Sequence, residues 1–141
     1  MTRMLLVDDN RMNQIVGLGM LDKIGFSAEV AGDGDAAIAM ISKRPYDLIF
    51  MDCEMPGMDG YDTTRVIREL EHTASRAETP IIGVSARTMA GDRDVAIEAG
   101  MDDYLTKPVR IEDLQRAVER WLGATEADAD SVATAFAVRT A

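Results

Sequence analysis

Short apolar runs alternate with longer amphipathic stretches along this chain. A run of four or five apolar residues bounded by turn residues is typical of a buried strand in a parallel sheet, whereas apolar residues three and four positions apart are typical of a helix. The pattern predicts strands at residues 4–7, 26–30, 48–51, 81–84 and 103–105. It predicts a helix after each strand, at residues 11–24, 33–43, 61–71, 89–98 and 111–122.

Residues that start or stop helices lie where these boundaries need them. Asp33 can cap the N-terminus of the second helix, and Pro45 cannot continue it. Gly25, Gly100 and Gly123 follow helical stretches and serve as C-terminal stops. The hydrophobic pattern and the capping residues therefore predict the same elements.

Five β–α units in roughly 120 residues indicate an α/β domain with a doubly wound, five-stranded parallel sheet. Right-handed crossovers make the first and third strands neighbours, which gives the flavodoxin-like (β/α)5 order 2-1-3-4-5. We expect this domain to occupy residues 1–123. Residues 124–141 are rich in alanine and carry little apolar mass. We expect them to form a flexible or loosely helical tail, too short for an output domain.

Composition limits the classes of function. The chain has 141 residues, of which 47% are hydrophobic and 28% charged, as in an ordinary globular protein. Its net charge of −10 argues against nonspecific binding to nucleic acid. No apolar stretch approaches the ~20 residues of a membrane span, and no signal-peptide pattern opens the chain. A single cysteine, Cys53, fits a reducing compartment. We therefore expect a small cytoplasmic domain that does not insert into membranes.

Carboxylates end two of the predicted strands. Asp8 and Asp9 follow the first strand, and Asp52 follows the third. These strand ends meet at one edge of the sheet, where ligands bind in open parallel sheets. Like charges about 4 Å apart repel by roughly 4 kcal/mol at an effective dielectric near 20, so a divalent metal or a lysine must lie among them. Lys107, at the end of the fifth apolar run, is a candidate.

Together these residues resemble the receiver domain of two-component response regulators, over residues 4–122. The matching elements are Asp8-Asp9, Asp52 within Met51-Asp52-x-x-Met55-Pro56-Gly57-Met58-Asp59-Gly60, Ser85-Ala86, Tyr104 and Lys107-Pro108. The opening Val7-Asp8-Asp9-Asn10-x-x-Asn13 is further similar to receivers attached to, or served by, hybrid histidine kinases in phosphorelays.

The resemblance implies a role for each acidic residue and for the lysine. Asp52 would be the nucleophile that accepts a phosphoryl group as an acyl phosphate. Asp9, Asp52 and the main-chain carbonyl of Glu54 would hold Mg²⁺, with Asp8 reaching the ion through water, because Mg²⁺ prefers hard oxygen ligands. Lys107 would pair with the phosphoryl oxygens. The Pro108 that follows it is expected in the cis form.

The resemblance also implies a switch and a set of partners. The hydroxyl of Ser85 would bond to the new phosphoryl group, and Tyr104 would rotate inward as Ser85 moves. This would change the face built by residues 89–98, 103–105 and 111–122, to which an unknown downstream protein would bind. The phosphoryl donor would be a histidine kinase or histidine phosphotransfer protein. It would dock on the start of the first helix, which carries Arg11, Met12, Asn13, Ile15 and Val16.

One further expectation concerns Glu54 and Arg87. Glu54 lies two residues after Asp52, and Arg87 lies two residues after Ser85. Both should flank the mouth of the site, where their opposite charges could form an ion pair across the path of an attacking water. The alternative is that the two side chains are solvated independently, because exposed ion pairs contribute only ~0–1 kcal/mol.

Two other classes of function compete with the phosphoacceptor. A metal-dependent phosphatase of the haloacid dehalogenase type uses an aspartyl nucleophile in an Asp-x-Asp motif after the first strand. This chain instead has Asp8-Asp9-Asn10 there. An interaction module independent of phosphorylation would lack the acceptor, acidic or lysine residues, and none of them is missing. We therefore expect a phosphoacceptor that catalyses its own phosphorylation and dephosphorylation rather than an enzyme.

Overall fold

The structure, a computed structural model, describes residues 2–87, 89 and 91–123. Its five parallel strands form one sheet in the order β2-β1-β3-β4-β5. The elements in chain order are β1 (Met4–Val7), α1 (Arg11–Lys23), β2 (Ala28–Ala31), α2 (Gly34–Lys43), β3 (Leu48–Asp52), α3 (Gly60–Thr73), β4 (Ile81–Ser85), α4 (Asp92–Ala99), β5 (Asp103–Thr106) and α5 (Ile111–Leu122). The predicted doubly wound, flavodoxin-like order is confirmed.

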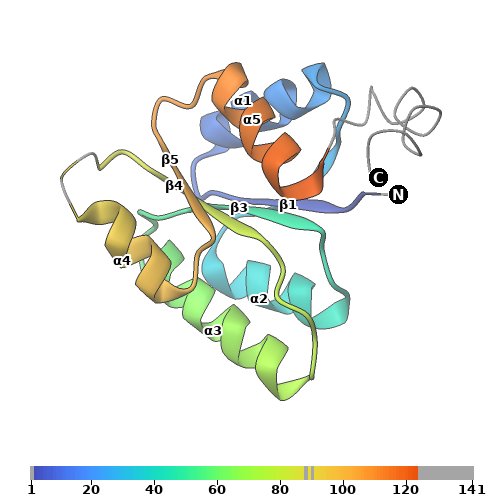
Figure 1. The fold of residues 1–141 in the computed structure, drawn as a ribbon, viewed down its shortest axis with the longest axis vertical. Helices are drawn as coiled ribbons and strands as arrows, with labels where there is room; N and C mark the ends of the chain where they lie inside the picture. Colours follow the sequence, from blue (N-terminus) through green and yellow to red (C-terminus); the bar gives the residue numbers. More distant parts are fainter. Residues whose placement is uncertain (1, 88, 90, 124–141) are drawn as a thin grey trace.

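Helices cover both faces of the sheet. α1 and α5 lie on one face, and α2, α3 and α4 lie on the other (Figure 1). The side chains of β3 alternate between the two cores: Ile49 and Met51 enter one, and Leu48 and Phe50 enter the other. Successive side chains of a strand point to opposite faces, so a strand covered on both faces must be apolar at every position.

The second strand begins two residues later than the pattern predicts. α1 ends in a tight turn in which Gly25 has a φ of +92°. The Phe26 amide closes that turn by donating to the Leu21 carbonyl at 2.9 Å. Phe26 is therefore part of the helix stop, and its apolar side chain packs in the core without belonging to β2.

Two helix starts also differ from the prediction. α3 begins at Gly60, because the Asp59 carboxylate accepts a hydrogen bond from the Asp62 amide and caps the helix. α4 begins at Asp92 rather than at residue 89. The Met89 amide instead donates to the Asp92 carboxylate at 2.8 Å, and the Met89 side chain is exposed. Met89 therefore belongs to the turn before the helix.

The expectation for residues 124–141 falls outside the described residues. In the part that the structure does describe, every helix is too short or too polar to cross a membrane.

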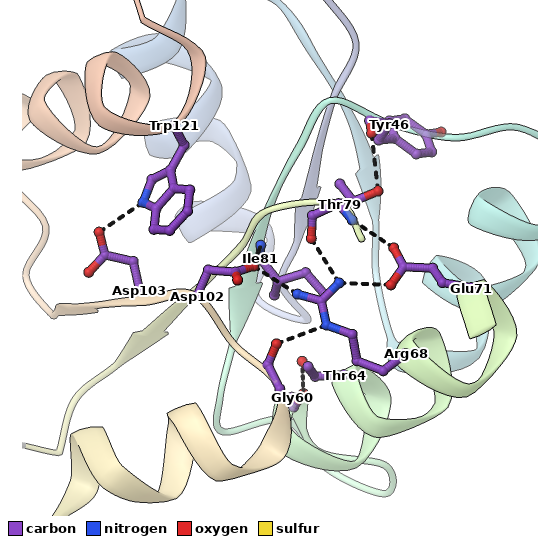
Figure 2. A network of polar contacts seen from close by, with 11 residues as sticks. Tyr46, Gly60, Thr64, Arg68, Glu71, Thr79, Ile81, Asp102, Asp103 and Trp121 are labelled. Atoms are coloured by element: carbon purple, nitrogen blue, oxygen red, sulfur yellow. Dashed lines mark hydrogen bonds and ion pairs between the residues drawn. The ribbon is translucent and has the colours of Figure 1, made fainter. Parts of the chain in front are cut away.

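A polar cluster around Arg68 ties α3 to the edge of the sheet where β4 and β5 begin (Figure 2). The Arg68 guanidinium donates to Glu71 at 2.8 Å and to Asp102 at 2.7 Å, and also to the carbonyls of Thr79 and Gly100. The second oxygen of Glu71, whose side chain is 2% exposed, accepts from the Thr79 amide. A buried carboxylate is tolerated because it is paired and hydrogen-bonded.

We predict that Arg68→Ala lowers the free energy of unfolding by about 3 kcal/mol, because it leaves Glu71 buried without its cation. Urea unfolding followed by circular dichroism measures this. The matched control is Arg65→Ala, one turn earlier on α3, which removes an exposed ion pair with Asp62. Its cost should be about 0–1 kcal/mol. Equal costs for the two variants would contradict the role of burial.

Candidate functional site

The predicted site residues meet at the carboxyl ends of four strands. Asp8 follows β1, Asp52 ends β3, Ser85 ends β4 and Lys107 follows β5. The parallel register places these ends side by side, and the Lys107 amide donates to the Ser85 carbonyl at 2.7 Å. The site therefore lies where β1 and β3 are neighbours and the connections to their helices diverge.

Three carboxylates crowd this edge of the sheet. Asp8, Asp9 and Asp52 each place an oxygen within 4.8 Å of the other two. Asp8 and Asp52 are buried, whereas Asp9 is exposed. A cluster of oxygen donors with one side open to solvent could hold a metal ion. Glu54 is not one of the three carboxylates in this cluster, and its predicted part in the metal set is through its main-chain carbonyl.

Lys107 supplies the positive charge that this cluster requires. Its Nζ donates to Asp52 Oδ1 at 3.0 Å, and the Glu54 amide donates to the same oxygen at 3.2 Å. The peptide bond between Lys107 and Pro108 is cis, as the family resemblance implies.

The protonation of Asp52 reflects its burial. Burial raises the pKa of Asp52 to about 6, although the Lys107 hydrogen bond opposes the shift, and the Asp8 charge raises the pKa further. Burial lowers the pKa of Lys107, but the hydrogen bond and charge of Asp52 outweigh it, so that pKa is raised. Three carboxylates and one lysine meet at this site, so its formal charge is negative when all of these groups are ionised.

The Glu54 carboxylate bonds to β4 and the loop after it, not to Arg87. Ser85 Oγ donates to one Glu54 oxygen at 2.5 Å, and the Ala86 amide donates to the other at 3.0 Å. No ion pair joins Glu54 to Arg87 within the described part of the chain, so that expectation was wrong. The reason is that the end of β4 offers the Glu54 carboxylate two hydrogen-bond donors, the Ser85 hydroxyl and the Ala86 amide, and both of its oxygens are used there.

Ser85 and Tyr104 are linked through the main chain of Arg87. The Arg87 amide donates to Ser85 Oγ at 3.0 Å, and the Tyr104 hydroxyl donates to the Arg87 carbonyl at 3.1 Å. Tyr104 is half-buried and packs against the core on the α2–α3–α4 face. The two residues predicted to form a switch are therefore both hydrogen-bonded to the main chain of Arg87.

Two supporting residues had not been identified from the sequence. Gln14 donates from Nε2 to the Asp8 carbonyl at 2.7 Å and so holds the acidic loop against α1. Gly60 packs directly on the end of β3, where a Cβ would lie 2.2 Å from the Asp52 carbonyl oxygen. Only glycine allows α3 to start so close to the end of β3. The sequence sign of this close approach was the glycine that ends the Met-Pro-Gly-Met-Asp-Gly motif.

A hollow of about 460 Å³ opens beside the site between α1 and α5. Asp8, Asp52 and Lys107 form part of its lining, and most of the rest is apolar, including Val16 and Leu114. Three apolar side chains of α1, Met12, Ile15 and Val16, are exposed, and Val16 also lines this hollow. The resemblance implies that these residues help to dock the phosphoryl donor, and the structure leaves them uncovered.

Comparisons with known proteins agree with this geometry. Residues 4–119 match the family model of the response regulator receiver domain. The chain is 38% identical over 121 residues to the sensor histidine kinase GacS of Pseudomonas protegens, an alignment that covers 86% of this chain and 13% of GacS. The chain therefore spans only a small part of that relative.

Solved structures give the same result. The receiver domain of sensor histidine kinase PA1611 from Pseudomonas aeruginosa PAO1, with a magnesium ion in its active site cleft, is 41% identical with a TM-score of 0.77. That match covers 87% of this chain and 98% of the other. A second match, with a TM-score of 0.80 and 29% identity, comes from the complex of the Saccharomyces cerevisiae phosphotransfer protein Ypd1 with the receiver domain of Ssk1. It covers 85% of this chain and 88% of the other.

We predict that the metal-free protein loses stability as the pH rises from about 4 to about 6. Burial raises the pKa of Asp52 to about 6, so the folded protein holds this proton more tightly than the unfolded chain, in which an aspartate has its ordinary pKa of about 3.9. The loss should be on the order of 3 kcal/mol. Urea unfolding in the presence of EDTA measures it as the difference from Asp52→Asn, which lacks this titration. A carboxyl ¹³C titration of Asp52 with its midpoint below 4 would contradict the prediction.

Proposed function

This chain belongs to the response regulator receiver domain family of two-component signalling, and from that premise we propose that Asp52 is its phosphoacceptor. The observation that carries the proposal is the pairing of the buried Asp52 carboxylate with Lys107 beside two further carboxylates. A histidine kinase or a histidine phosphotransfer protein would supply the phosphoryl group.

The proposed reaction is a transfer between two side chains. An ionised Asp52 oxygen forms a bond to phosphorus, the P–N bond of the donor phosphohistidine breaks, and the leaving imidazole nitrogen takes up a proton. Catalysis of this step is mostly positioning and neutralisation of charge. Lys107, already 3.0 Å from Asp52, would contact the phosphoryl oxygens, and the Ser85 hydroxyl would donate to one of them.

Mg²⁺ fits this site as its cofactor. Bound there, the ion would neutralise charge on the transferring phosphoryl group. The side-chain donors of Asp8, Asp9 and Asp52 are all oxygens, which suit Mg²⁺ better than zinc or copper. The Glu54 carbonyl is the fourth protein group in this proposal. The magnesium ion in the cleft of the PA1611 receiver domain supports the assignment.

Phosphorylation would act on the face of α4, β5 and α5 through Ser85 and Tyr104. Arg87 would connect the two residues. If Ser85 moves, the Arg87 main chain bonded to its hydroxyl would move with it, and the Tyr104 hydroxyl donates to the carbonyl of that same residue. Asp103 supports this face as one unit. Its carboxylate accepts from Trp121 of α5 at 3.0 Å (Figure 2). It also pairs with Arg93 of α4. The phosphoryl group would shift an existing equilibrium between two conformations.

The donor protein would dock on α1. Met12, Ile15 and Val16 form an exposed apolar patch next to the hollow that leads to Asp52. An apolar centre with a polar rim suits a transient interface. The complex of Ypd1 with the Ssk1 receiver domain supports a phosphotransfer protein as one such partner. The downstream protein that would bind the α4–β5–α5 face is unknown.

In this proposal the chain is a switch that promotes its own phosphorylation and dephosphorylation, not an enzyme with an external substrate. The family match favours it over the phosphatase alternative. A cytoplasmic location is part of the proposal, favoured by the acidic composition and the unpaired Cys53. The receiver domain would extend over residues 1–123, with residues 124–141 as a separate tail.

We predict that acetyl phosphate with Mg²⁺ adds one phosphoryl group to the protein, measured by intact mass. Asp52→Asn should abolish labelling, since the nucleophile is lost. EDTA and Asp9→Ala should each slow it by about tenfold or more, because metal ligands are removed. Asp35→Ala, which removes an exposed carboxylate from α2, is the matched control and should label normally. Labelling of Asp52→Asn at the wild-type rate would refute the acceptor assignment.

We predict that Ile15→Glu slows transfer from a phosphorylated histidine phosphotransfer protein by about tenfold or more, because it places a charge in the apolar docking patch. Labelling by acetyl phosphate, which needs no docking, should be unchanged. Val66→Glu, at an exposed position of α3, is the control for an added surface charge. If Ile15→Glu reduces both reactions equally, the residue acts on the fold and not on docking.

A further inference from the structure

We propose that the Glu54 carboxylate is an internal competitor of the phosphoryl group, and that it holds the groups that recognise phosphate until phosphorylation displaces it. This inference rests on the proposed function. It assigns Glu54 a role as a positioning residue that sets how readily Asp52 is phosphorylated.

The contacts of Glu54 carry the proposal. Its two oxygens accept from Ser85 Oγ at 2.5 Å and from the Ala86 amide at 3.0 Å. An anion held by a hydroxyl and an adjacent main-chain N–H is the arrangement that a phosphoryl oxygen would need at the same place. The carboxylate therefore occupies a ready-made anion site at the end of β4.

The donors cannot serve both anions. A serine hydroxyl and a backbone amide each offer one hydrogen, and in this structure both hydrogens go to Glu54. Register pairs Asp52 with Val84, so a phosphoryl group on Asp52 would approach Ser85 from the neighbouring strand. Both anions carry negative charge, so they also repel each other at this range. Phosphorylation must therefore displace the Glu54 side chain.

Displacement is sterically feasible. Ser85 is fully buried, but Glu54 is half-buried and borders solvent. Its main chain is fixed, since the Glu54 amide donates to Asp52, whereas the side chain can rotate outward. The main-chain carbonyl would remain available to the metal. Glu54 can thus leave the donors without disturbing the rest of the site.

The same contact sets the resting state of the proposed switch. Ser85 Oγ, held by Glu54, accepts from the Arg87 amide, and the Arg87 carbonyl accepts from Tyr104. The chain without a phosphoryl group thus already holds the Ser85 loop against an anion. Removal of Glu54 should free the donors for phosphate and also loosen the loop before phosphate arrives.

The test compares Glu54→Ala with wild type, using beryllofluoride with Mg²⁺ as the phosphoryl analogue and acetyl phosphate as the donor. We expect Glu54→Ala to bind the analogue at least about threefold more tightly and to be labelled faster by a similar factor, because a competing charged acceptor is gone. Glu54→Gln keeps the shape and one acceptor oxygen, so it should give intermediate values. Glu69→Ala, which removes an exposed carboxylate from α3, should match wild type in both measurements.

A double-mutant cycle shows whether the effect passes through Ser85. The gain from Glu54→Ala should shrink in a Ser85→Ala background, since one of the two contested donors is already missing. The Ala86 amide resonance of the unligated protein should also shift in Glu54→Ala and not in Glu69→Ala.

The outcomes separate this inference from the proposed function. A wild-type protein that is labelled on Asp52, with Glu54→Ala equal or weaker in analogue binding, overturns the inference alone. An unshifted Ala86 amide in Glu54→Ala overturns it as well. A wild-type protein that takes up neither the analogue nor a phosphoryl group refutes the proposed function, and the inference falls with it.

Discussion

The ion pair between Lys107 and Asp52 is the contact on which the site depends. The two residues lie 55 positions apart in the chain, yet their charged atoms are 3.0 Å apart. In a parallel sheet the carboxyl ends of neighbouring strands lie side by side, and here this brings the buried Asp8 and Asp52 together. The Lys107 hydrogen bond does not fully offset the cost of burying Asp52, because burial, with a further contribution from the Asp8 charge, raises the pKa of Asp52 to about 6. The crowded carboxylates are the physical reason why this site would attract a cation, and the proposed transfer of a phosphoryl group to Asp52 needs that cation to neutralise charge.

Buried charges are arranged differently at the two ends of the parallel strands. Glu71 and Asp102 are each paired with Arg68, and each also accepts a hydrogen bond from a main-chain amide (Figure 2). These contacts join α3 to the starts of β4 and β5. At the opposite edge, the carboxylates remain close together with one lysine. A stable edge far from the chemistry allows the other edge to keep an arrangement that would be costly alone.

The Glu54 carboxylate occupies the groups on which the proposed switch would depend. If these donors were free, the Ser85 hydroxyl would have no anion to bond to until Asp52 was phosphorylated. Here Ser85 and the Ala86 amide already bind an anion from the chain itself, and their contact continues through Arg87 to Tyr104. The difference between the resting and phosphorylated protein would then be an exchange of one anion for another, which makes the equilibrium sensitive to a single side chain.

The sequence by itself determined the α/β class, the strand order and the set of residues at the strand ends, because apolar period, capping residues and right-handed crossovers are local or general constraints. It missed the starts of β2 and α4, where the Phe26 amide and the Asp92 carboxylate serve turns rather than regular elements. It placed Asp8, Asp52, Ser85 and Lys107 together correctly. Only the tertiary structure decided that Glu54 bonds to Ser85 and not to Arg87, and that Gln14 supports Asp8. Side chains choose among partners within a few ångströms, and those distances arise only once separate strands pack side by side.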